Sequence, residues 1–439
     1  MKFQYPLLAA TFLFYSLLIP AASAAVSVKV SADREEAIYS ENEEVTFSVS
    51  AFDGEKKLDW GEVEWRLTLD GYREISKGKG TLEGGKGLSV SGKLDKPGFL
   101  LLTATFTGTD GKRVSGYGGA AVSPLKIGPS MPAPDDFDAF WKSQKEALAK
   151  VPLKFEESRQ PVKAGAGKVV QAFDVQIDCG KSELPVSGYF AKPEKAEAGS
   201  LPAVLWVHGA GVRSSILTTA VRGAENGFLS MDINAHGIPN GKPAQFYTDL
   251  SKGELKTYRT DGNTSRDEIY FRGMCLRLVR AIDYLTSKPE WDGKTVAVIG
   301  HSQGGYQALV AGGLDERVTF IGSGVPAGCD HTGMMAGRIS GWPKIVPILP
   351  DGKPNPAAVE ACRYIDGMNF ASRCKAEAIV SVGFIDRTCP ATSVYAAYNV
   401  LQGKKQMINE PSMGHAAPAP IKDRFFEALM EHVGMAAVK

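Results

Sequence analysis

The sequence predicts two parts: a small all-β sandwich, followed by a larger α/β domain with a doubly wound, mostly parallel sheet. Three patterns lead to this prediction. Apolar and polar residues alternate with period two over residues 26–122, a proline-rich connection follows, and apolar runs then alternate with helical stretches beyond residue 150. Period two is typical of half-buried strands, whereas continuous apolar runs between helices are typical of parallel strands covered on both faces.

The first part, residues 26–124, is expected to form an immunoglobulin-like sandwich. Turn-forming segments such as FDGEKK, LEGGKG and GTDGK separate its strands, and no helical periodicity intervenes. Two packed antiparallel sheets would bury the apolar faces of such strands. The alternating apolar positions are Val45, Phe47 and Val49; Val63, Trp65, Leu67 and Leu69; and Leu100, Leu102, Ala104 and Phe106.

The connection SPLKIGPSMPAPDDFDAFWKSQKEALAK carries four prolines and leads into a helix that we expect to begin near Asp135 with an aspartate cap. Residues 125–439 are assigned to the α/β domain. Its strands are expected at VVQAFDVQI, LPVSGYFAKP, PAVLWVHG, FLSMDINAHG, TVAVIGHS, VTFIGSGVP, EAIVSVGFID and KKQMINEPSMGH.

The N-terminus has the pattern of an export signal over residues 1–25. Lys2 precedes the apolar run PLLAATFLFYSLLIP, and the small residues AASAAV then fit cleavage after Ala24 or Ala25. The alternative is a membrane anchor, but the apolar run is shorter than the roughly 20 residues that span a bilayer. We therefore expect a protein exported to the periplasm or secreted, without a membrane span after cleavage.

Charge and cysteine content limit the partners and the chemistry. Lys and Arg total 50 against 49 Asp and Glu, a net charge of +1, and no basic block would track a phosphate backbone, so nucleic acid is not an expected partner. The six cysteines lack CxxC spacing, which disfavours a zinc site. Export permits disulfides, and we expect one or two bridges among buried free thiols, with 15 possible pairings for six cysteines.

Ser302 is the candidate nucleophile. It lies in the GxSxG motif formed with Gly300 and Gly304, between the strand TVAVI and the helical stretch YQALVAGG. A serine at such a strand-to-helix elbow projects its hydroxyl from the edge of the sheet, and the glycines permit close approach of neighbouring backbone. The alternative is an ordinary turn residue, since GxSxG also occurs by chance.

A serine nucleophile needs a base, and the base needs an acid that fixes its tautomer. Asp386 follows the strand EAIVSVGFI and His415 lies in a loop after the next strand, so the order Ser302, Asp386, His415 is that of an α/β-hydrolase triad. Asp330 is the best rival acid. Asp366 and the histidines at 208, 236, 301, 331 and 432 are the other substitutes.

The oxyanion formed during ester attack needs donors that are already in place. The backbone N–H of Gln303, directly after the nucleophile, is one candidate. The second is the N–H of Ala210 in the glycine-flanked segment HGAG, after the strand PAVLWV. An ordinary turn is the alternative for HGAG.

These motifs resemble the acetyl xylan esterase and cephalosporin C deacetylase family of α/β-hydrolases. The resemblance covers most of residues 130–439 and none of the β-rich part, and it is most specific between Tyr270 and Val318. It implies that the family's nucleophile, acid and histidine fall on Ser302, Asp386 and His415, that its Tyr-Arg-Gly-like segment falls at YFRG, and that its oxyanion-loop tyrosine falls on Ala210.

The sequence departs from the family at two motifs. Asn234, Ala235 and His236 stand where the family has Arg-Gly-Gln, and Ala416 replaces the glutamate after the histidine. These changes affect the expected substrate pocket and the hexameric assembly that the resemblance implies, so the oligomeric state is left open.

The leading hypothesis is an exported serine esterase that removes small acyl groups, acetyl foremost, from sugar hydroxyls of xylan or related glycans. This chemistry proceeds through an acyl-enzyme and requires no metal or organic cofactor. The alternatives are a feruloyl or glucuronoyl esterase, a peptidase of the prolyl oligopeptidase kind, and an inactive glycan-binding protein. About 100 residues are too few for the propeller that such peptidases carry in front.

Overall fold

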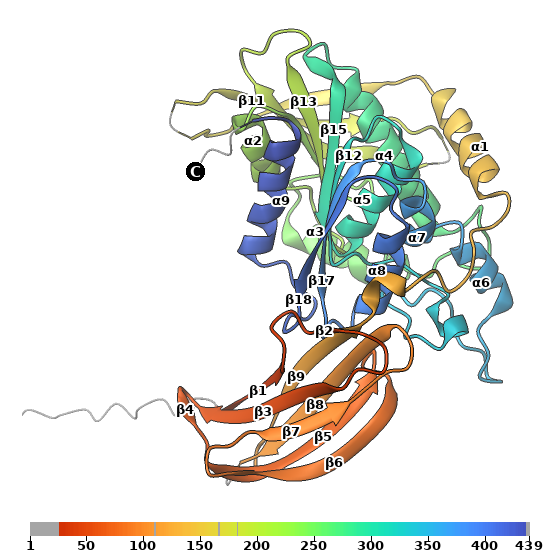
Figure 1. Ribbon diagram of the computed structural model, residues 1–439. Helices are drawn as coiled ribbons and strands as arrows, with labels where there is room; N and C mark the ends of the chain where they lie inside the picture. The colour runs from red at the N-terminus through yellow and green to blue at the C-terminus, as the bar shows by residue number, and fades with distance from the viewer. Residues whose placement is uncertain (1–25, 109–110, 166, 182, 436–439) are drawn as a thin grey trace, which may run out of the picture.

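The computed structural model describes residues 26–108, 111–165, 167–181 and 183–435 (Figure 1). Its main feature is a nine-stranded, mostly parallel sheet preceded by an all-β region, as the sequence predicts. The expected export signal, residues 1–25, lies outside the described residues. No helix within the described ranges is both long and apolar enough to cross a membrane.

The all-β region consists of two sheets packed face to face. One contains β1, β3, β4 and β7, and the other has the order β2-β9-β8-β5-β6. Val45, Phe47 and Val49 are completely buried, as are Val63 and Leu67 on the facing sheet, so the predicted alternation marks the inner faces. The strands are β1 Val26–Ala32, β2 Ile38–Tyr39, β3 Val45–Asp53, β4 Lys56–Lys57, β5 Trp60–Leu69, β6 Arg73–Glu83, β7 Leu88–Gly92, β8 Gly98–Thr107 and β9 Arg113–Val122.

The large sheet has the order β10-β11-β12-β14-β13-β15-β16-β17-β18. Its first three pairings are antiparallel, and every pairing from β14 onward is parallel. Parallel pairing gathers the carboxyl ends of the central strands at one edge, where loop residues can converge. The strands are β10 Phe155–Gln160, β11 Val170–Ile177, β12 Val186–Pro193, β13 Leu201–Val207, β14 Leu229–Ile233, β15 Trp291–His301, β16 Phe320–Gly324, β17 Glu377–Gly383 and β18 Lys405–Glu410.

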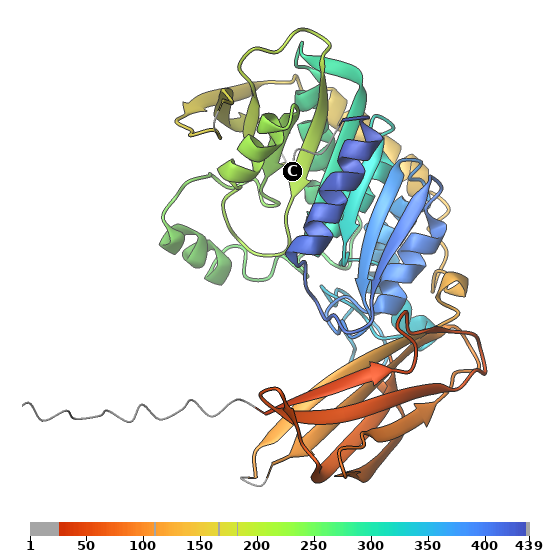
Figure 2. The same ribbon diagram turned by 60° about the vertical axis from the view of Figure 1, so that its left-hand side comes forward.

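Helices cover both faces of this sheet, with α2 and α9 on one side and α4, α5 and α8 on the other (Figures 1 and 2). Successive residues of β15 face opposite sides, since Ile299 packs with α9 and Val298 belongs to the larger core cluster. The helices are α1 Phe137–Ala149, α2 Leu217–Glu225, α3 Ala244–Lys252, α4 Tyr270–Thr286, α5 Gln303–Leu314, α6 Pro356–Cys362, α7 Gly367–Ala371, α8 Ala391–Val400 and α9 Ala419–His432, with short 3₁₀ helices at Pro124–Lys126 and Gly333–Ala336.

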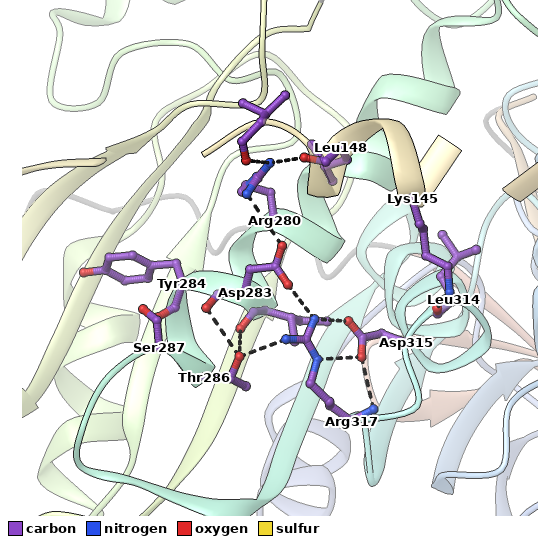
Figure 3. A network of polar contacts seen from close by, with 12 residues as sticks. Lys145, Leu148, Arg280, Asp283, Tyr284, Thr286, Ser287, Leu314, Asp315 and Arg317 are labelled. Carbon is purple, nitrogen blue, oxygen red and sulfur yellow. Dashed lines mark hydrogen bonds and ion pairs between the residues drawn. The ribbon is translucent and has the colours of Figure 1, made fainter. Parts of the chain in front are cut away.

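A polar network centred on Arg317 fixes α4 against the end of α5 (Figure 3). The Arg317 guanidinium donates to Asp315 at 2.9 Å and to Asp283 of α4 at 2.7 Å. Arg280 of α4 donates to the carbonyl of Leu148 in α1 at 2.6 Å. The network therefore holds α4 between its neighbours, and with it the helix that begins just after Ser302.

The structure corrects two local expectations. Asp136 precedes α1, which begins at Phe137, but its carboxylate makes no cap hydrogen bond and instead binds Arg266 at 2.5 Å. The expected disulfides are also absent, because all six cysteines are buried free thiols. A free cysteine packs in a protein core like a small apolar side chain, so a buried thiol does not require a disulfide bond.

The β-rich region packs against the loop that follows β17. The ring of Phe99 lies edge-on to Phe384 with 5.1 Å between centroids and also contacts Tyr395 of α8. Asn399 donates to the carbonyl of Pro124, at the end of the β-rich part, at 2.9 Å. Asp70 accepts a hydrogen bond from the Thr392 hydroxyl, so apolar and polar contacts both join the two parts.

Asp70 makes this interface sensitive to pH. Burial raises the pKa of Asp70 to about 6, and its Oδ2 atom has no hydrogen-bond partner among the described residues. The folded state therefore binds the proton more tightly than the unfolded chain, where the pKa is about 3.9. It follows that this group's contribution to stability is present below pH 4 and is lost as the pH rises towards 6.

We predict that Asp70→Asn gains stability relative to the wild type as the pH rises from 4 to 7, by up to about 3 kcal/mol, because the amide cannot ionise. Urea unfolding at pH 4, 5.5 and 7 measures this difference. Asp53→Asn, at an exposed position of β3, controls for loss of a charge elsewhere. A constant difference between Asp70→Asn and the wild type across this range would contradict the prediction.

Candidate active site

Ser302 lies at a sharp elbow between β15 and α5. Its backbone has φ 59° and ψ −122°, a sparsely populated conformation for a residue with a side chain. A Cβ placed on Gly300 would lie 2.3 Å from the carbonyl oxygen of Val207, and one on Gly304 would lie 2.4 Å from the same atom. Both glycines of the motif are therefore required by the close passage of the end of β13.

The structure brings Ser302, His415 and Asp386 together in one hydrogen-bonded chain. The Nε2 atom of His415 lies 2.9 Å from the Ser302 hydroxyl, and its Nδ1 atom lies 2.7 Å from Oδ2 of Asp386. The other carboxylate oxygen of Asp386 accepts the N–H groups of Thr388 and Cys389 at 2.8 and 2.9 Å. With Asp386 as acceptor, Nδ1 carries the proton and Nε2 can accept from the serine.

Asp330, the rival acid, occupies a different environment. It is fully buried, and its carboxylate accepts from the backbone N–H of Ser130 at 3.0 Å and from Arg338 at 2.9 Å. Asp366 accepts the backbone N–H of Asp330 at 2.9 Å. Both aspartates thus belong to a buried cluster that fixes loops against the connection from the β-rich region.

The other five histidines do not take part in the hydrogen bonds that join Ser302, His415 and Asp386. Burial lowers the pKa of four of them, to about 4 for His208 and His301 and about 3 for His236 and His331. The fifth, His432, binds Glu377 at 2.9 Å at the end of α9. None of these five rings replaces His415 as the partner of Ser302.

The segment after β13 lies beside the nucleophile. A Cβ placed on Gly209 would be 3.4 Å from the Cβ of Ser302, which puts the Gly209–Ala210 segment next to the serine. Arg213 fixes this segment by donating to the Gly209 carbonyl at 2.9 Å. Gln303 is the first residue of α5, so its backbone N–H has no acceptor within the helix. The first turn of α5 and the Gly209–Ala210 segment therefore both lie next to Ser302.

A buried cluster of polar side chains holds the side chain of Gln303. Its central residue is Tyr258, which the sequence analysis did not single out. The Tyr258 hydroxyl donates to Oε1 of Gln303 at 3.2 Å, and the Tyr258 ring lies edge-on to His236 at 4.7 Å. His236 in turn contacts the Tyr270 hydroxyl at 2.8 Å. Tyr258 lies in a loop without periodicity, so only the tertiary structure reveals its role. His236, which stands in the segment where the family has Arg-Gly-Gln, is a buried residue of this cluster.

Comparison with known proteins identifies the family of this chain. The family model for acetyl xylan esterase (AXE1) matches residues 126–432. The chain belongs to the acetyl xylan esterase family. It is therefore a carboxylic ester hydrolase, as the sequence predicts. The family match spans the α/β domain, and the hydrogen-bonded Ser302, His415 and Asp386 all lie within it.

Individual proteins similar to this esterase are also acetyl or acetyl xylan esterases. It is 32% identical over 365 residues to the acetyl esterase Axe7A of Xylanibacter ruminicola, covering 81% of this chain and 79% of that one. The acetyl xylan esterase from Paenibacillus sp. R4 superposes with a TM-score of 0.59 at 27% identity, over 70% of this chain and 98% of that chain. Acetyl xylan esterase 1 from Thermoanaerobacterium sp. JW/SL YS485 shares the fold, with a TM-score of 0.57 at 22% identity over 70% and 97% of the two chains.

One group of potential metal ligands overlaps the site of the esterase. Donor atoms of Asp386, Cys389 and His415 lie within 4.8 Å of one another. Burial raises the pKa of the Cys389 thiol well above its usual range, so the thiolate needed for metal binding is disfavoured. The other two residues already bind each other at 2.7 Å. The geometry therefore fits a hydrogen-bonded pair better than a metal centre.

The β-rich region contacts the loop that carries Asp386 on both sides of this residue, at Phe384 and at Arg387. A Cβ placed on Gly119 of β9 would lie 2.6 Å from the Cβ of Phe384, two residues before Asp386. On the other side, a Cβ on Gly71 would lie 3.6 Å from Cγ of Arg387. The loop that carries the carboxylate is thus clamped by the sandwich as well as by its own backbone hydrogen bonds.

We predict that Gly119→Ala lowers the kcat for a small acetyl ester about 10- to 100-fold with little change in KM, because the new methyl group displaces Phe384 and with it Asp386. Steady-state kinetics with p-nitrophenyl acetate measures this split. Gly118→Ala is the matched control: its Cβ would lie 2.6 Å from Val30 inside the sandwich and does not face the acid loop. Equal losses of kcat in both variants would show that the effect is general destabilisation.

Proposed function

We propose that this esterase hydrolyses acetyl esters on the sugar hydroxyls of xylan or related glycans by a serine mechanism. The observation that carries the proposal is the hydrogen-bonded chain from Asp386 through His415 to Ser302 at the elbow. A hydroxyl is a weak nucleophile at neutral pH, and an imidazole that accepts its proton activates it. The buried carboxylate stabilises the imidazolium that results.

In the first half of the reaction, Ser302 Oγ attacks the ester carbonyl while His415 Nε2 takes the serine proton. The C–O bond to the sugar then breaks, and His415 returns the proton to the leaving alkoxide, which gives the free sugar hydroxyl and an acetyl-serine. In the second half, His415 deprotonates a water molecule that attacks this ester. Acetate leaves, and the proton returns to Ser302.

The oxyanion of each tetrahedral intermediate is assigned to the backbone N–H groups of Gln303 and Ala210. The helix N-terminus at Gln303 favours negative charge, and the Tyr258 cluster and Arg213 hold the two segments in place before the substrate binds. Removal of one such donor typically costs about 10²- to 10³-fold in rate.

The glycan substrate is supported by the family and by its relatives, which are named as acetyl or acetyl xylan esterases. A cavity of about 540 Å³ lies between α2 and α9 and is bounded on one side by Gly209 and Gly300, but neither Ser302 nor Ala210 lines it. Ala210 stands where the family has a tyrosine, so we expect a broad range of sugar alcohols, whereas the acid and base geometry of the family favours small acyl groups. Residues 125–439 are proposed as the catalytic unit and residues 1–25 as an export signal, which would place the enzyme with extracellular glycans.

We predict that Ser302→Ala abolishes acetate release from acetylated xylo-oligosaccharides and leaves the melting temperature within a few degrees of the wild type, because the change removes the nucleophile and little packing. An organophosphonate probe should label the wild type at Ser302 and fail to label the variant. Turnover near the wild-type rate, with contaminating esterase excluded by purification of the variant, would refute the serine mechanism.

We predict opposite signatures for the two candidate acids. Asp386→Asn should lower kcat by about 10⁴-fold, as loss of the tautomer-fixing carboxylate does in a serine protease, with a normal melting temperature. Asp330→Asn should instead lower the melting temperature, because it breaks the buried contact with Arg338. Paired kinetics and thermal unfolding separate the two effects. The reverse ranking in kcat would exchange their roles.

A further inference from the structure

The outer face of the five-stranded sheet forms a groove of about 600 Å³ that borders the α/β domain. Val63 and Leu67 of β5 point inward and are completely buried, so Glu64 and Arg66 between them point outward. Side chains from four strands line the groove, and Arg387 of the α/β domain completes it. No step of the proposed reaction uses this surface.

The pairing of the strands places the side chains that line the groove in rows across the sheet. Arg66 lies opposite Lys77 on one side and Thr103 on the other, and Thr103 lies opposite Tyr117. This row crosses four strands, which spans about 14 Å at the usual strand spacing. Tyr117 is 40% exposed, so its ring is available to stack on a sugar face.

Positive charge is in excess along the groove. Glu64 is shared between Lys79 at 2.7 Å and Arg113 at 2.5 Å. The groove is lined by five cationic side chains and one carboxylate: Arg66, Lys77, Lys79, Arg113 and Arg387 against Glu64. Glu74, at its border, is likewise shared between Arg66 and Lys77, at 3.1 and 3.2 Å. Since the whole chain has a net charge of only +1, this excess is a local feature.

Arg387 connects the groove to the candidate active site. It directly follows Asp386, is exposed, and has no acidic partner in the part of the chain that the structure describes. Its aliphatic stem packs over Gly71 at the turn between β5 and β6. A chain lying in the groove would therefore reach the loop that carries the candidate acid.

We propose that this groove binds the uronic-acid-substituted stretch of a xylan chain, with Tyr117 stacking on a sugar ring and the excess cations pairing with its carboxylates. Glu64 and Glu74 offset only part of this positive charge, and a neutral glycan would leave the rest uncompensated, whereas carboxylate groups complement it. The proposal rests on the proposed function, because it takes the bound chain to be the one that presents its acetyl groups to Ser302.

The test measures binding without turnover. The full chain carrying Ser302→Ala is titrated by calorimetry with deacetylated glucuronoxylan, with neutral arabinoxylan and with polygalacturonate. We expect glucuronoxylan to bind at least about tenfold more tightly than arabinoxylan, and this preference to shrink as salt rises from 0.15 to 1 M. Adding Arg66→Ala and Lys77→Ala should weaken glucuronoxylan binding about tenfold.

Lys56→Ala with Lys57→Ala is the matched control, since it removes two exposed lysines from β4 of the opposite sheet. It should leave affinity within about twofold, and thermal unfolding checks that both double variants fold. Equal affinity for glucuronoxylan and arabinoxylan, or equal loss in both double variants, would overturn the proposal. Polygalacturonate binding as tight as glucuronoxylan would also overturn it, because the groove would then recognise charge alone.

Failure of the groove and failure of the proposed function have different signatures. If the wild type releases acetate from acetylated glucuronoxylan but the inactive variant shows no preference for the uronic acid, the groove assignment is wrong and the function stands. If the inactive variant shows the preference but the wild type releases no acetate from any acetylated xylan, the esterase proposal fails and the binding site stands.

Discussion

The close contact between the end of β13 and the elbow at Ser302 is the constraint on which the site depends. The carbonyl oxygen of Val207 lies so near Gly300 and Gly304 that neither position has room for a Cβ atom. This contact holds the serine at a positive φ with its hydroxyl exposed at the carboxyl edge of the sheet. It also brings the segment after β13 alongside the serine, so the candidate nucleophile and one proposed oxyanion donor are positioned by the same packing.

Asp386 and His415, the candidate acid and base, reach this edge from neighbouring strands. Asp386 follows β17 and His415 follows β18, and parallel pairing of these strands places both loops on the side of the sheet where β15 ends. Their positions are then fixed by local contacts. Backbone N–H groups hold one oxygen of Asp386, and the β-rich region presses on Phe384 and Arg387 at either side.

The β-rich region therefore contributes contacts to the α/β domain beyond simple attachment. Its inner faces form a core with Phe47 and Val63, its end packs against the acid loop, and its outer face carries an excess of cations. A structural contact with the candidate active site and a surface for a polymeric substrate are compatible, because the two faces of one sheet are independent. The arrangement gives a physical reason for the presence of an additional domain in this esterase.

The sequence by itself predicted the two-part architecture and most strands of both parts, and it singled out Ser302, Asp386 and His415, which the structure joins by hydrogen bonds. Period-two alternation, apolar runs and a glycine-flanked serine depend on short-range regularities that a sequence carries directly. It did not determine that the cysteines are free, that Asp136 binds Arg266 rather than capping α1, or that Tyr258 supports Gln303. Those outcomes, together with the row of cations beside Arg387, depend on which distant segments meet in space. Only the tertiary structure decides that, because each such contact joins residues whose spacing in the chain leaves no periodic trace.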